Sequence, residues 1–153
     1  MKKTITIIAL LIATISVAQS KYQNGMKKAF QLWNNGKMNE ASQLFERIEK
    51  AEPTKWKPAY YFANIETISS FKIKDEATLN AKLKKAQEYL DLAKNNSENN
   101  PEIIAAQALI NTAYIAFDGQ KYGMTLSGKN TQLYTKALEI DPKNPRIVLA
   151  NAE

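Results

Sequence analysis

The 153-residue sequence contains no cysteine and no histidine. Without cysteine the chain can form no disulfide and can carry no thiol-linked lipid, so its stability must come from packing. Without histidine it lacks the commonest general base and a common zinc ligand. Carboxylate pairs such as Glu46/Glu49 and Glu88/Asp91 remain, but i, i+3 pairs arise often on solvated helix faces. We therefore expect no catalytic residue, no metal site and no cofactor.

Positive charge is dispersed along the chain rather than concentrated. The formal net charge is +6, and the densest basic group is Lys82, Lys84 and Lys85. Scattered lysines are typical of a solvated surface. The sequence therefore predicts no nucleic-acid partner and no binding to anionic lipid.

The N-terminal segment has the anatomy of a secretory leader. Met1-Lys2-Lys3 precedes an apolar run over residues 5–17, which is shorter than the roughly 20 residues that a membrane-spanning helix needs. Ser16-Val17-Ala18 supplies small residues where a signal peptidase cleaves. We predict a signal peptide over residues 1–19, removed after Ala18 or Gln19. The Ala-Gln ending resembles Gram-negative leaders, so we expect a periplasmic or secreted protein without membrane insertion after signal cleavage.

Apolar residues recur at helical spacing after the leader, so residues 20–153 are predicted to form one all-α domain. From Tyr22 to Trp33 they fall at i, i+4, i+7, i+8 and i+11. Gly36 is predicted to end this helix in the left-handed conformation. Asp75 is predicted to cap a later helix and Pro101 to open another. No stretch alternates polar and apolar residues over the length of a strand.

Two distant segments share one pattern, in which an aromatic residue is followed by a packing residue and then by proline. Ala41, Phe45, Ile48 and Pro53 have the same offsets as Asn130, Tyr134, Ala137 and Pro142. The pattern resembles the second helix of a tetratricopeptide repeat (TPR). The resemblance implies antiparallel helix pairs stacked as a right-handed superhelix, an α-solenoid. The repeats would span residues 22–55, 56–100 and 101–144, with a partial fourth over 145–153.

The stretch GMTLSGKN, residues 123–130, comes within one residue of the phosphate-binding loop GxxxxGK[ST]. Asn130 stands where that loop needs a magnesium-binding Ser or Thr, and no buried strand precedes it. We interpret residues 118–128 as an irregular link relaxed by its glycines. Ser127 is then expected to cap a helix that runs to Ile140.

The resemblance also implies a concave groove lined by the first helix of each repeat. The matching positions are apolar or amide-bearing, which suits an extended peptide or a helix better than a highly charged ligand. They are Met26, Phe30, Trp33, Tyr60, Asn64, Thr67, Ala105, Leu109 and Thr112.

These features predict a non-enzymatic, exported scaffold that binds a protein or peptide partner in its groove. Two alternatives stay open. The chain could be an accessory domain of a larger enzyme or envelope assembly complex whose chemistry lies in other sequence. It could also form a homo-oligomer through its open C-terminal end, where Ile147 and Leu149 begin a repeat that lacks its second helix.

Overall fold

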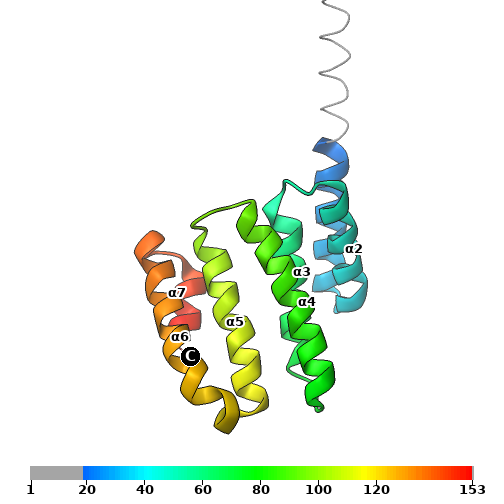
Figure 1. Cartoon of the computed structure of the whole chain (residues 1–153). Coiled ribbons are helices and arrows are strands. Elements are labelled where there is room, and N and C mark those ends of the chain that lie inside the picture. The colour runs from blue at the N-terminus through cyan, green and yellow to red at the C-terminus, as the bar shows by residue number, and fades with distance from the viewer. Residues whose placement is uncertain (1–18, 153) are drawn as a thin grey trace, which may run out of the picture.

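A computed structural model describes residues 19–152, and this part of the chain consists of helices joined by short connectors, with no strand. The predicted all-α class is therefore confirmed. The predicted signal peptide lies almost wholly outside the described residues. A first helix covers residues 19–34, and the helices that follow it are α2 (Met38–Ala51), α3 (Trp56–Ser70), α4 (Glu76–Asn95), α5 (Pro101–Phe117), α6 (Gly119–Ile140) and α7 (Pro145–Ala152) (Figure 1).

The predicted helix ends are confirmed where a cap or a special backbone angle sets them. Gly36 has a φ of 75°, the left-handed conformation that glycine adopts without a Cβ clash. The Asp75 carboxylate accepts the backbone N–H of Thr78 at 2.8 Å. Pro101 stands in the first turn of α5, where its missing N–H costs nothing. Local chemistry therefore fixes these boundaries.

The prediction for residues 118–128 is wrong, because α6 begins at Gly119 rather than at Ser127. Asp118 is its cap and accepts the backbone N–H of Lys121 at 3.0 Å. The side chains of Lys121 and Tyr122 both donate to Glu76 of α4. Three glycines disfavour a helix here, each by about 1 kcal/mol relative to alanine. The cap and these tertiary contacts outweigh that cost.

Helices adjacent in sequence pack against each other, and the odd-numbered helices also meet. The most extensive contacts join α3 to α4 and α5 to α6. In addition, α3 contacts α5, and α5 contacts α7. The helix pairs therefore follow one another across the molecule in chain order, from the first helix to α7 (Figure 1). A right-handed superhelical stack stays a prediction.

The two segments with the shared sequence pattern end their helices in the same way. Helix α2 ends at Ala51 and α3 begins at Trp56, while α6 ends at Ile140 and α7 begins at Pro145. The connectors over 52–55 and 141–144 are equal in length, and each has proline in its second position. The packing positions before them are buried, except that Tyr134 is half-buried where Phe45 is fully buried. The sequence pattern thus predicted a repeated local structure.

Candidate interaction surface

The structure separates the predicted groove residues into a buried and a partly exposed set. Met26, Tyr60, Asn64 and Thr67 are at most 9% exposed, so they cannot line an open groove in this structure. The other predicted residues keep part of their surface, and binding by them stays a prediction. They are Phe30, Trp33, Ala105, Leu109 and Thr112.

On α3 the predicted positions lie one residue too early. Tyr60 and Thr67 are turned into the core, whereas the next residues along, Tyr61 and Ile68, keep exposed surface. One step along an α-helix rotates the side chain by roughly 100°. The helix is apolar on nearly all sides, so its sequence did not reveal which stripe faces solvent. The exposed stripe also includes Lys57 and Phe71.

On α5 the predicted positions do lie on a partly exposed stripe. Ala105 and Leu109 are half-buried, and Ala116 further along the same side is exposed. Thr112 points toward α6, where its hydroxyl donates to the carbonyl of Ala108 and accepts from the Asn130 amide at 3.0 Å. Leu109 is thus the largest apolar side chain on the partly exposed stripe of α5, since the other two residues on it are alanines.

Phe30 and Trp33 belong to an aromatic cluster with Phe45 and Tyr61. The Phe30 ring lies 4.6 Å from the Tyr61 ring and 5.4 Å from the Phe45 ring, measured between centroids, both edge to face. Trp33 meets the same two rings edge to face at 6.2 and 6.5 Å. These are favourable aromatic geometries. The two residues therefore hold the first helix against α2 and α3, in addition to any role on the surface.

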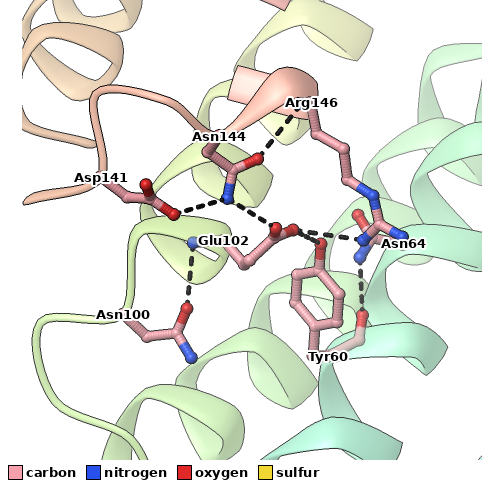
Figure 2. A network of polar contacts seen from close by, with 7 residues as sticks. All are labelled: Tyr60, Asn64, Asn100, Glu102, Asp141, Asn144 and Arg146. Carbon is pink, nitrogen blue, oxygen red and sulfur yellow. Dashed lines mark hydrogen bonds and ion pairs between the residues drawn. The ribbon is translucent and has the colours of Figure 1, made fainter. Parts of the chain in front are cut away.

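Glu102, at the start of α5, joins three helices through its carboxylate (Figure 2). Tyr60 of α3 donates its hydroxyl to Oε2 at 2.8 Å, and the Asn144 amide donates to Oε1 at 3.0 Å. The Arg146 guanidinium of α7 lies 3.4 Å from Oε2. Sequence analysis missed this site, since an acidic residue in a first turn is ordinarily explained by the helix dipole alone.

The charges in this network are compensated. Burial alone would raise the pKa of Glu102, but hydrogen bonds from Asn144 and Tyr60 and the charge of Arg146 outweigh it, so that pKa is lowered. Burial, and then the hydrogen bond to Glu102, raise the pKa of Tyr60. A hydrogen bond to Tyr61 and the charge of Glu102 raise the pKa of Arg146. At neutral pH the carboxylate is thus ionised and the phenol protonated, an arrangement that fixes α7 in place rather than one that transfers protons.

Three exposed stripes lie on helices that pack on one another, since α3 contacts α5, α5 contacts α7, and Arg146 of α7 reaches Glu102 of α5. We call the three stripes together the odd-helix face. It comprises Lys57, Tyr61 and Ile68 of α3 with Phe71 just after its end, Ala105, Leu109 and Ala116 of α5, and Arg146 and Leu149 of α7.

A pocket of about 220 Å³ lies at one end of this face, where the C-terminal ends of α3 and α5 meet. Phe71 and Ala116 are common to the pocket and the face. Phe71 is 43% exposed, so an apolar group could reach its ring. The full lining is Ser70, Phe71, Ile73, Lys74, Ala113, Ala116 and Phe117.

Asn130, the residue that departs from the phosphate-loop pattern, is a buried interhelical residue of α6. Its amide oxygen accepts from Asn111 at 2.8 Å, and its amide nitrogen donates to the Ala108 carbonyl at 3.2 Å and to Thr112. Residues 123–130 lie inside the helix, where backbone N–H groups bond to carbonyls one turn earlier. The stretch therefore presents no cradle of free N–H groups.

Within residues 19–152, no group of three or more acidic side chains is placed to hold a metal ion. None of the helices described in that range is both long and apolar enough to cross a membrane. No family model, curated protein or solved structure matches the chain.

Proposed function

We propose that this chain is a non-enzymatic scaffold of the TPR type that is exported and binds a protein or peptide partner on the odd-helix face. The observation that carries the proposal is the pattern of helix contacts. Helices α3 and α5 each pack on the helix that follows them, α4 and α6, and also on the next odd-numbered helix. Stacked helix pairs in a repeat array make the same contacts, and the repeated helix ends at 52–55 and 141–144 agree with that arrangement.

Exposed apolar side chains favour the odd-helix face as the place for a partner. Ile68, Phe71 and Leu149 are 40%, 43% and 64% exposed. Gathered apolar side chains at a surface commonly mark a site of protein interaction. Lys57 and Arg146 add polar groups at the margin, as is usual for the rim of an interface. A partner that presents an apolar strip from an extended segment or a helix fits this composition.

The test uses two variants that differ in position but not in chemistry. Ile68 on α3 is 40% exposed and Leu92 on α4 is 39% exposed, so Ile68→Glu and Leu92→Glu place the same charge on surfaces of equal exposure. The purified wild-type protein, immobilised, captures partners from an envelope extract, and each variant is compared with it. We expect Ile68→Glu to lose a partner that Leu92→Glu retains. A partner retained equally by both variants would contradict the odd-helix face.

Export is tested separately, by the mass of the protein recovered from the cell envelope. The leader predicted over residues 1–19 supports export, and cleavage after Ala18 or Gln19 should leave a chain that begins at Gln19 or Ser20. A recovered mass that includes residues 1–18, or recovery only from the cytoplasm, would exclude the exported form.

Self-association is a second candidate, favoured by the exposed apolar side chains of α7. Val148 and Leu149 are 47% and 64% exposed, while Ile147 on the same helix is fully buried. If a second copy covers this surface, Leu149→Glu should convert an oligomer into a monomer in sedimentation or size-exclusion measurements. A wild-type protein that is already monomeric at high concentration would remove this candidate.

A further inference from the structure

A second pocket, of about 150 Å³, lies between α4 and α6 with α5 as its floor. It is lined by Leu90, Asp91 and Lys94 of α4, by Ser97, Asn99 and Asn100 of the connector, by Ile103, Ile104 and Gln107 of α5, and by Leu133 and Lys136 of α6.

This pocket opens on a different side of α5 from the odd-helix face. Ile103, Ile104 and Gln107 are one, two and five residues beyond Glu102, which places them roughly 100° to 200° around the helix from that carboxylate. No residue of the odd-helix face lines the pocket. The two surfaces can therefore be tested independently.

The floor of the pocket is apolar and of single-side-chain size. Leu90 and Ile103 form buried parts of it, at 2% and 4% exposure, and Ile104 and Leu133 contribute half-buried surface. An apolar cavity of comparable volume accommodates a benzene-sized group. One leucine-like or aromatic side chain would fill it.

The rim carries positive charge from two helices. Lys94 and Lys136 are both exposed, and neither has an ion-pair or hydrogen-bond partner within residues 19–152. The one acidic lining residue, Asp91, accepts a hydrogen bond from the Gln87 amide at 3.0 Å. That bond comes from a neutral amide, so Asp91 keeps its negative charge and the three charged lining residues sum to one net positive charge. An apolar floor beneath a net positive rim complements a group that joins a carboxylate to an apolar side chain.

We propose that this pocket binds the C-terminal residue of a peptide whose last side chain is apolar. The last side chain enters the floor formed by Leu90, Ile103 and Leu133, and the terminal carboxylate lies between Lys94 and Lys136. Ser97 and Asn99 of the connector are polar lining residues that can meet the amide group preceding the last residue. Peptide C-termini, rather than free acids, supply that extra amide.

The experiment measures binding of acetyl-alanyl-alanyl-leucine to the protein as it is produced by the cell, by titration calorimetry at low ionic strength. The same peptide with an amidated C-terminus serves as the ligand control. We expect the free acid to bind about tenfold more tightly than the amide, since a charge-assisted hydrogen bond is lost with the carboxylate. The variant Lys94→Gln/Lys136→Gln should bind acid and amide equally.

The protein control is Lys27→Gln/Lys129→Gln, which removes the same charge from exposed positions outside the pocket. It should keep the preference for the free acid. Because all four lysines are exposed, both variants should melt at the wild-type temperature. Equal binding of acid and amide by the wild type, loss of the preference in the control variant, or no binding of either peptide would overturn the proposal. Isovalerate binding as tightly as the peptide would also overturn it, because the preceding amide would then contribute nothing.

Discussion

The two halves of the molecule are held together by different kinds of side chain. Rings fill the interfaces among the first helix, α2 and α3, where Phe30, Trp33, Phe45 and Tyr61 form one cluster. Alanines and amides predominate in the interface of α5 with α6, where Asn130 and Ala137 are the only buried residues of α6 and one ring pair, Tyr114 with Tyr122, also makes contact. Rings contribute a large apolar area, arranged edge to face or offset-stacked, whereas short polar side chains contribute little area and a few directional hydrogen bonds.

The difference teaches that close helix packing can be reached by two routes in one chain. Where large rings fill an interface, stability should respond mainly to the volume that a substitution removes. Where side chains are small, it should respond mainly to a lost hydrogen bond. Substitutions can separate the two responses, and both tryptophans, Trp33 and Trp56, report only on the ring-packed half. Circular dichroism reports on all helices.

The largest effect is expected from Phe45→Ala, because Phe45 is fully buried and contacts Phe30, Trp33 and Tyr61. Removal of the ring leaves a cavity between α2 and its neighbours and should lower the free energy of unfolding by about 3 to 5 kcal/mol. Urea unfolding followed by tryptophan fluorescence measures it. A loss below that of Asn130→Ala would contradict the comparison.

A smaller loss, of about 2 kcal/mol, is expected from Asn130→Ala. The change removes three hydrogen bonds and leaves the Asn111 amide and the Ala108 carbonyl without their α6 partner. The midpoint by circular dichroism should fall further than the midpoint by tryptophan fluorescence. Asn80→Ala, at an exposed position of α4, is the control and should change stability by no more than about 0.5 kcal/mol.

Glu102→Gln tests the link between the halves and should cost about 1 to 2 kcal/mol at neutral pH, since hydrogen bonds to a charged acceptor are lost. The pKa of Glu102 is lowered in the folded protein, so its contribution to stability is complete above its unfolded pKa of about 4.3. That contribution disappears as pH falls through the lower folded value. The wild type should therefore lose more stability than the variant on acidification below about pH 4.3. If the unfolding free energies of the wild type and the variant fell equally with pH, this prediction would be refuted.

The smallest effect, and the one of opposite sign, is expected in the glycine-rich first half of α6. Gly123→Ala and Gly128→Ala should each raise stability by about 0.5 to 1 kcal/mol, because a Cβ at either position meets nothing within 4 Å. Gly36→Ala is the contrasting change, since its φ of 75° disfavours a side chain, and it should lower stability. Destabilisation by both α6 changes would mean that this helical segment is not formed in solution.

Sequence patterns predicted most of the helices because their signals are local. Gly36, Asp75 and Pro101 act through their own backbone or the adjacent turn. The first half of α6 carries a local cap in Asp118, but its three glycines argue against a helix, and the contacts that offset them are made with Glu76, which lies far away in the sequence. No reading of residues 118–128 alone contains that information.

The exposed surface was predicted less well, for a geometric reason. Four of the groove residues were assigned to solvent but are buried, and on α3 an error of one residue separates Tyr60 from Tyr61. A helix that is apolar around most of its circumference carries no dominant stripe. Its orientation depends on neighbours such as Glu102 and Phe45, which reach it only in the folded chain.

The shared carboxylate at Glu102 bears on how far a disturbance can travel along the molecule. In an array whose units interact only with their immediate neighbours, a disturbance reaches a more distant unit only through the unit between them, as in a one-dimensional nearest-neighbour lattice. Here Tyr60 in α3 and Arg146 in α7 are bound by one side chain that belongs to neither. Glu102 therefore couples α7 directly to α3, and fraying of α7 should also destabilise the α3–α4 pair.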